Sequence, residues 1–209
     1  NIPADAAAVV LARPTVDLND AEIGVLRRYL DRGGSLLILT DVLFNADAFM
    51  KQDGAFNTYL WENFGLRALD AAVVDPLVSR QTALEIMSAY TFADTDIGAR
   101  LDPAQNPTVF RLARPVQVNI DNAPPNIANG QVVLSSEQSF GETNLMTLGE
   151  TNTYQYDAGV DLPGPLSTVA WATNLTNEAK IVLIGDSDFV TNGLVMTGGN
   201  GVLFTDSMT

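Results

Sequence analysis

The stretch AKIVLIGDSDFVTN, Ala179 to Asn192, decides the fold class of this chain. Its first six residues are apolar except for Lys180, and three of the six are β-branched, which favours a strand. An apolar run without polar alternation is typical of a strand that is covered on both faces, as in a parallel α/β sheet. We therefore expect a buried strand here, with helices packed on both faces of its sheet.

Polar residues come directly after this predicted strand. Gly185 permits a sharp turn, so the residues behind it lie at the carboxyl end of the strand. In open α/β sheets, ligands bind at that edge. The candidate ligand-binding residues of this stretch are Asp186, Ser187, Asp188 and Asn192.

A β-α-β unit near the start of the chain supports a parallel sheet. The apolar runs 6–12 and 35–40 predict two buried strands. Between them, Asn19 is a good N-cap, and Glu22 three residues later completes a capping box for a helix with an apolar stripe. The second strand ends in Asp41, which we expect at the same edge as the aspartates after Gly185.

The remaining sequence fits one α/β domain that spans residues 1–209. The spacing of aromatic residues predicts a second helix over 56–64. The strand predicted at 167–173 is separated from the strand after Ala179 by a short turn, which indicates a hairpin and a mixed edge to the sheet. Prolines and scattered aromatic residues loosen the pattern over 77–131, and we interpret this segment as an insertion or excursion from the sheet.

Charge and residue inventory exclude several classes of protein. The formal charge of −14, from 25 acidic and 11 basic residues, repels phosphate backbones and anionic lipids, so we expect no nucleic acid partner and no direct lipid binding. The acidic surface either aids solubility or offers a cation site. Because the chain has no cysteine and no histidine, it has no disulfide, no zinc finger and no Cys–His or Ser–His–Asp catalytic group.

Membrane attachment is not expected within this sequence. No segment approaches the roughly 18 consecutive apolar residues that a membrane helix needs. The chain begins at Asn1 without a methionine, so we interpret it as a piece of a longer protein.

Four motifs in this order resemble one protein family. They are LRRYLDRGGSLLILTD (26–41), VVDP (73–76), SSEQSFGETNL (135–145) and IGDSDFVTN (184–192), with GNGVLF (199–204) near the end. Together they resemble the extracytoplasmic domain of the auxiliary component of ABC-type transport systems. This gliding-motility-associated family is related to a domain of intraflagellar-transport proteins. The resemblance covers nearly the whole chain, although Asp41 is followed by Val42 where members commonly have proline.

This resemblance implies a flavodoxin-like domain similar to class I glutamine amidotransferases, without their catalytic cysteine and histidine. The sheet would be mostly parallel, with helices on both faces. The resemblance also implies an extracytoplasmic location, with anchorage to the cytoplasmic membrane through helices outside this sequence. The implied partners are the permease and ATPase subunits of an ABC transporter.

Three kinds of site chemistry are conceivable at the strand ends. The sequence Gly-Asp-Ser at 185–187 is similar to the nucleophile block of SGNH-type hydrolases, but no histidine is present to take the serine proton, and no motif places a lysine near it. Asp41, Asp186 and Asp188 offer oxygen ligands for Ca²⁺ or Mg²⁺, or instead cap the following helix. Phosphate-binding glycine motifs are absent, so we expect no nucleotide and no other cofactor.

A second polar stretch completes the candidate ligand-binding surface. Ser136, Glu137, Gln138 and Glu142 provide acceptors and amide donors suited to a sugar or a peptide. Alternatively, Glu142 and Asp188 fix loops through backbone hydrogen bonds. The sequence thus predicts a non-enzymatic binding or interaction module. The alternative is a carboxylate- or metal-dependent hydrolase of amidotransferase-like fold.

Overall fold

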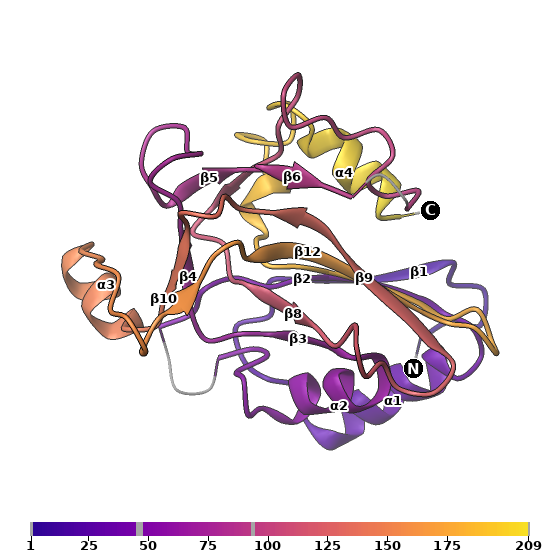
Figure 1. Cartoon of the computed structure of the whole chain (residues 1–209). Helices are drawn as coiled ribbons and strands as arrows, with labels where there is room; N and C mark the ends of the chain where they lie inside the picture. The colour runs from indigo at the N-terminus through magenta and orange to yellow at the C-terminus, as the bar shows by residue number, and fades with distance from the viewer. Residues whose placement is uncertain (1, 45–47, 93–94, 209) are drawn as a thin grey trace.

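A six-stranded mixed sheet forms the centre of the structure, a computed structural model that describes residues 2–44, 48–92 and 95–208 (Figure 1). The strand order is β1-β2-β13-β12-β9-β6. β1 (Ala8–Ala12), β2 (Ser35–Leu39) and β13 (Lys180–Ile184) are parallel. β12 (Ser167–Asn174), β9 (Ile127–Leu134) and β6 (Tyr90–Thr91) each run antiparallel to the preceding strand in this order.

The prediction of a mostly parallel, flavodoxin-like sheet is therefore corrected. Only β1, β2 and β13 are joined by parallel pairing, and β1 lies at an edge, whereas the flavodoxin order has its first strand in second place. The predicted hairpin of β12 and β13 is confirmed, but it lies in the middle of the sheet. The turn between these strands is too short for the crossover that a parallel pair requires, so this pair has to be antiparallel.

The predicted β-α-β unit is confirmed, with helix α1 (Asp20–Leu30) between β1 and β2. The prediction that its first strand is buried is wrong, because β1 lies at the edge of the sheet and none of its five residues is buried. The capping box of α1 is complete, because Asn19 Oδ1 accepts from the backbone of Glu22 while the Glu22 carboxylate accepts from the backbone of Asn19. The second predicted helix is α2 (Ala55–Phe64), which ends at Gly65 in the left-handed conformation. No helix within the described residues is long and apolar enough to cross a membrane.

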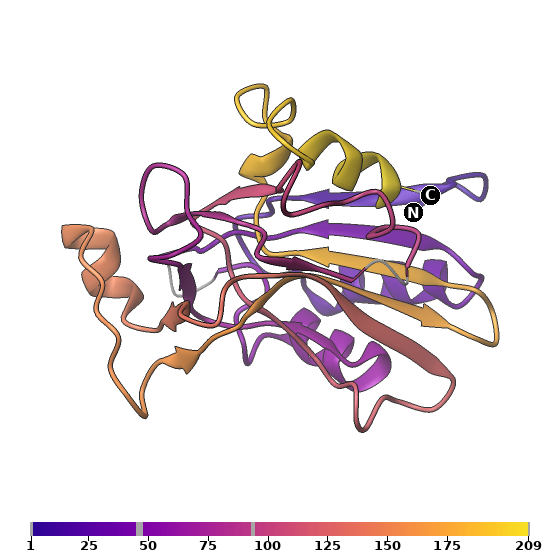
Figure 2. The same ribbon diagram turned by 45° about the horizontal axis from the view of Figure 1, so that its top comes forward.

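Both faces of the main sheet are covered, as the apolar strands predicted (Figure 2). Alternate residues of β2 and β13 pack against α1 and α2 on one face. The intervening residues pack on the other face against η1 (Asp188–Val190), a 3₁₀ turn, and α4 (Asn200–Asp206). α4 is only seven residues long, so this second face is covered over part of its length.

Three small antiparallel sheets surround the main sheet. One joins β4 (Ala72–Val74), β10 (Phe140–Glu142) and β11 (Leu162–Pro163). The others pair β3 (Leu66–Ala68) with β8 (Val116–Val118), and β5 (Glu85–Met87) with β7 (Val109–Arg111). Helix α3 (Leu145–Thr151) follows β10.

The segment 77–131, which we interpreted as an insertion or excursion, takes part in several of these sheets. It supplies β5, β7 and β8, the edge strand β6 of the main sheet and the first residues of β9. Its regular pairing with distant segments was not visible in its irregular sequence pattern.

The carboxyl ends of four main-sheet strands lie at one edge. β9 and β13 are both antiparallel to β12 and therefore run in the same direction as β1 and β2. Leu134 pairs with Ser167, and Ile184 pairs with Val169, so both strands end near the start of β12. This carboxyl edge carries the candidate site.

Candidate functional site at the carboxyl edge

Asp41, after β2, and Ser187, after β13, contact each other at this edge. Asp41 Oδ1 accepts the Ser187 N–H at 2.7 Å, and Asp41 Oδ2 accepts the Ser187 Oγ–H at 2.8 Å. Asp41 Oδ2 also binds Arg13 Nε at 2.8 Å. The Asp41 side chain is 12% exposed and that of Arg13 58% exposed, so the cation forms the solvent side of this cluster. The structure thus places Asp41 and the residues after Gly185 together, as their strand-end positions predicted.

Asp186 is fully buried next to this cluster. Its Oδ2 accepts the Arg111 N–H at 2.8 Å, and its Oδ1 accepts the Asp188 N–H at 2.7 Å. Desolvation by burial raises the pKa of Asp186 to about 8, although the two N–H donors favour the charged form. Because Asp188 begins η1, Asp186 acts as a cap for this turn and also ties β7 to the end of β13.

A buried arginine that the sequence did not point to lies beneath the edge. The Arg114 guanidinium is surrounded by protein oxygens at 2.9–3.1 Å, namely the carbonyls of Phe49, Met50 and Leu69, the hydroxyl of Thr40 and the carboxylate of Asp70. Burial lowers the pKa of Arg114, which the charges of Asp70 and Asp41 oppose. Arg114 joins the loops after β2 and β3 to the main sheet, and no local motif distinguishes it from a surface arginine.

Glu85 is a second buried charge that sequence reasoning missed. It is 4% exposed and sits at the start of β5. Its Oε1 accepts a hydrogen bond from Arg111 Nη2 at 3.0 Å and lies 3.7 Å from Arg80 Nη1, while Oε2 has no hydrogen-bond partner among the described residues. Glu85 and Arg111 line an open pocket of about 330 Å³. This pocket adjoins the candidate edge through Arg111, whose N–H binds Asp186.

Ser136, after β9, makes the same type of contact as Ser187, but with a different aspartate. Asp75, directly after β4, accepts the Ser136 N–H through Oδ2 and the Ser136 Oγ–H through Oδ1, both at 2.8 Å. Asp75 is fully buried. Glu137 and Gln138 follow Ser136 in an exposed turn. In the sequence Asp75 stands out only as part of the motif VVDP, and its role becomes visible once Ser136 is placed beside it.

The remaining candidates are Glu142, Asn192 and Asp188, of which Glu142 lies apart from the Asp41 cluster, in the small sheet that contains β10. Glu142 is buried in β10, where its Oε1 accepts the Asn144 N–H at 2.8 Å and its Oε2 accepts the Gln155 N–H at 3.2 Å. Glu142 therefore fixes a loop through backbone hydrogen bonds, which is the alternative role that the sequence suggested for it. Asn192 is exposed beyond η1. Asp188 is partly exposed, and its carboxylate accepts no hydrogen bond from the described part of the chain.

Among the described residues at the carboxyl edge, Ser187 has no free base beside it that could take its proton, as serine hydrolysis needs. The Ser187 hydroxyl donates to Asp41, which is already bound by Arg13. Lys180 lies at the opposite end of β13 from Ser187, and Lys51 pairs with Asp53. Within residues 2–44, 48–92 and 95–208, no three acidic side chains are grouped to hold a metal ion. What remains accessible is a set of charged and amide side chains suited to binding.

Comparison with known proteins finds structural similarity but no match in sequence. No protein-family model and no curated protein matches this sequence. A solved structure described as the "mmIFT52 N-terminal domain" superposes with a TM-score of 0.66 over 96% of this chain and 76% of that chain, at 16% sequence identity. At such an identity the likeness shows the fold alone. The chain is therefore an α/β domain with a six-stranded mixed sheet, small antiparallel sheets and a fold like that of the IFT52 N-terminal domain.

Proposed function

We propose that this domain is a non-enzymatic binding or interaction module. The observation that carries the proposal is the internal use of the strand-end groups. Asp41, Asp186 and Ser187 are bound by other groups of the protein, so none is free to act on a substrate. The accessible side chains beside them, Arg13 and Asp188, are charged groups that can recognise a ligand without transforming it.

We further propose that the module is the extracytoplasmic part of an accessory protein of an ABC transporter. The four ordered motifs support this assignment, and the fold likeness to the IFT52 N-terminal domain is compatible with the family they resemble. In this proposal the domain contacts the permease subunit of the permease–ATPase complex, or a carbohydrate or peptide of the cell envelope. Membrane anchorage would come from helices outside this sequence.

Glu137 and Gln138 are the residues of choice for a test, because both are exposed in one turn at the carboxyl edge. The double variant Glu137→Arg/Gln138→Arg changes the charge there by three units without touching a buried group. The matched control is Glu178→Arg/Thr176→Arg, which makes the same change in the exposed β12–β13 turn at the other end of the sheet.

The experiment measures binding of the full-length protein to the purified permease–ATPase complex of the proposed transporter, by biolayer interferometry. We expect the edge variant to lose about tenfold in affinity, equal to about 1.4 kcal/mol, and the control to stay within about twofold. Equal binding by both variants would contradict a role of this edge. Turnover of a hydrolase substrate that disappears in Asp188→Asn, with the fold retained, would favour the enzymatic alternative.

A further inference from the structure

The outer edge of the main sheet at β1 is unpaired. β1 pairs with β2 on one side, and no described segment pairs with its other side. All five of its residues, AVVLA, are apolar, yet none is buried, and Val10 is 39% exposed. Unpaired edge strands normally carry charge, proline or a bulge that prevents association, and β1 has none of these within its length.

The opposite edge of the sheet is protected in a way that β1 is not. β6 is only two residues long, Tyr90 and Thr91, and so offers very little backbone to another strand. β1 offers five residues in regular register with β2, from Ala8 opposite Ser35 to Ala12 opposite Leu39. A strand of this length is sufficient for pairing with an added segment.

The outward-facing backbone groups of β1 can be assigned from its pairing with β2. The Arg13 N–H, directly after β1, donates to Leu39 O at 3.0 Å. Since the direction of N–H groups alternates along a strand, the N–H groups of Leu11 and Val9 also face β2. Those of Val10 and Ala12 therefore point away from the sheet, together with the carbonyls of the same residues.

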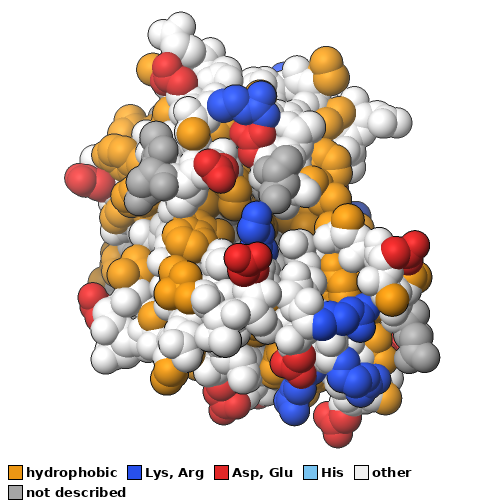
Figure 3. All heavy atoms as spheres, turned by 90° about the vertical axis from the view of Figure 1, so that its right-hand side faces the viewer, with side chains coloured by type: hydrophobic (Ala, Val, Ile, Leu, Met, Phe, Trp, Pro, Cys, Tyr) orange, Lys and Arg blue, Asp and Glu red, His pale blue; other side chains and the backbone are white. Residues whose placement is uncertain are grey.

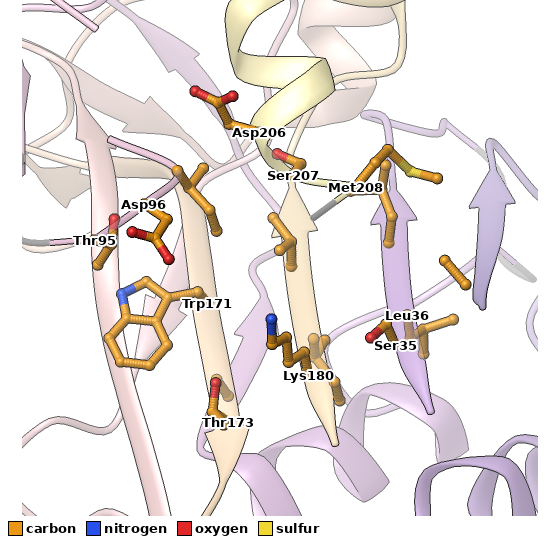
Figure 4. Close-up of a pocket in the computed structure, with 16 residues that line it drawn as sticks. Ser35, Leu36, Thr95, Asp96, Trp171, Thr173, Lys180, Asp206, Ser207 and Met208 are labelled. Carbon is orange, nitrogen blue, oxygen red and sulfur yellow. The ribbon is translucent and has the colours of Figure 1, made fainter. Parts of the chain in front are cut away.

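A pocket adjoins β1 on the face that α4 covers incompletely. It has a volume of about 280 Å³ and extends from Ala8 of β1, across β2 and β13, to Trp171 of β12 (Figure 4). Met208 lies over the β2 side, and Lys180 extends along the floor. Figure 3 views this side of the molecule, where hydrophobic and charged side chains lie around a hollow. Ala8, Val10 and Ala12 face the same side as this pocket, because they pair with Ser35, Leu37 and Leu39.

We propose that β1 receives an extended segment of a partner protein, which adds a seventh strand to the sheet. Main-chain hydrogen bonds to Val10 and Ala12 would supply the affinity, and one side chain of the added strand would reach over the small Ala8 into the pocket. The inference rests on the proposed role as an interaction module and names the chemistry of one partner.

The net charge of the chain favours a different protein, and not a second copy of this chain, as the partner that pairs with β1. Each copy carries a net charge of −14, so pairing two copies along β1 would bring two strongly negative molecules together. The same charge attracts a basic partner. The segment that fits has aliphatic residues at alternate positions, which match the apolar face of β1, and lysine or arginine on its flanks.

The experiment uses the ¹⁵N-labelled domain and the synthetic peptide acetyl-Lys-Val-Thr-Val-Thr-Val-Lys-amide. With the peptide at about ten times its Kd, amide exchange of Val10 and Ala12 should slow about tenfold, while Val9 and Leu11 keep their rates. A peptide of the same sequence that is N-methylated at alternate residues lacks the strand-pairing donors and should have no effect.

Two variants and one control separate edge pairing from other binding. Val10→Pro removes an outward N–H without removing a bond to β2, and Val10→Lys places a charge on the edge, so both should abolish the protection. Val160→Lys makes the same change at an exposed valine outside the main sheet and should leave the protection intact. If Val10→Pro does not fold, Val10→Lys carries the test.

Several results would overturn the inference. They are equal binding of the N-methylated peptide, undiminished binding to Val10→Lys, and protection that appears without peptide together with a dimer in sedimentation. The last would identify a second copy as the occupant. Because the transporter assay changes Glu137 and Gln138 and this assay changes Val10, either proposal can fail while the other stands.

Discussion

Two aspartate–serine pairs of this molecule share one geometry and differ in their surroundings. Asp75 and Asp41 each follow a strand, and each accepts both the N–H and the Oγ–H of a serine that follows another strand. Asp75 is fully buried and also accepts the N–H groups of Leu77 and Val78, at 3.0 and 2.9 Å. Asp41 is partly exposed, and its third partner is the solvent-exposed Arg13.

The difference shows that the same local contact serves two purposes. Asp75 and Ser136 are both buried, so this pair fixes a turn and connects β4 to the end of β9. The pair formed by Asp41 is completed by a mobile type of side chain that a ligand can compete for. Burial, and not the identity of the residues, makes one pair structural and leaves the other open.

The largest expected effect is that of Asp75→Ala. The change leaves the N–H and Oγ–H of Ser136 without an acceptor in a buried site, and the N–H groups of Leu77 and Val78 without one in a partly buried site, which should lower the free energy of unfolding by about 3–5 kcal/mol. Urea denaturation monitored by circular dichroism measures this change. A loss below about 1 kcal/mol would mean that water reaches this site and would remove the contrast with Asp41.

Asp186→Asn should alter the pH dependence of stability. The pKa of Asp186 is about 8 in the folded protein and near 3.8 when unfolded, so the folded state binds the extra proton between these values. The free energy of unfolding should therefore fall as pH rises from about 4 to about 8, by at most about 1.4 kcal/mol per pH unit from this group.

Asparagine cannot ionise, so the variant should lose this part of the slope in denaturation curves recorded at several pH values. Asp121→Asn, at an exposed aspartate outside this turn, is the control for the loss of one carboxylate, because the charge of Asp188 contributes to the raised pKa of Asp186. Identical slopes in the wild type and Asp186→Asn would show that Asp186 is ionised in the folded protein.

Asp41→Ala should lower the free energy of unfolding by less than Asp75→Ala does. It removes the acceptor of Ser187 and the partner of Arg13, but solvent can hydrate the groups left behind. We expect a loss of about 1–2 kcal/mol in the free energy of unfolding, measured as for Asp75. A loss equal to that of Asp75→Ala would show that the two pairs are equally structural.

Arg13→Ala should have the smallest effect on stability, about 0–1 kcal/mol, because the arginine is mainly solvated. Its effect should appear instead in binding of the full-length protein to the permease–ATPase complex. Arg28→Ala, at a position on the outer side of α1, provides an arginine control. An unstable Arg13→Ala protein with unchanged binding would reverse the distinction drawn between the two pairs.

Local parts of the fold could be predicted because local physics determines them. The capping box at Asn19 and Glu22, the αL glycine after α2 and the β12–β13 hairpin are each set by residues close in sequence. The strand-end position of Asp41 and Ser187 followed from the same reasoning. The pairings of β12 with β9, of β9 with β6 and of β4 with β10 did not, because each joins segments that are distant in sequence.

The sequence by itself determined the apolar strands, the caps and the absence of cysteine and histidine, since these depend only on residue type and spacing. Only the tertiary structure decided that Arg114, Glu85 and Asp186 are buried and that β1 is left unpaired. The physical reason is that burial and pairing depend on which distant segments cover a residue. The residues next to a charged side chain in the sequence do not show which oxygen atoms will surround it in the folded protein.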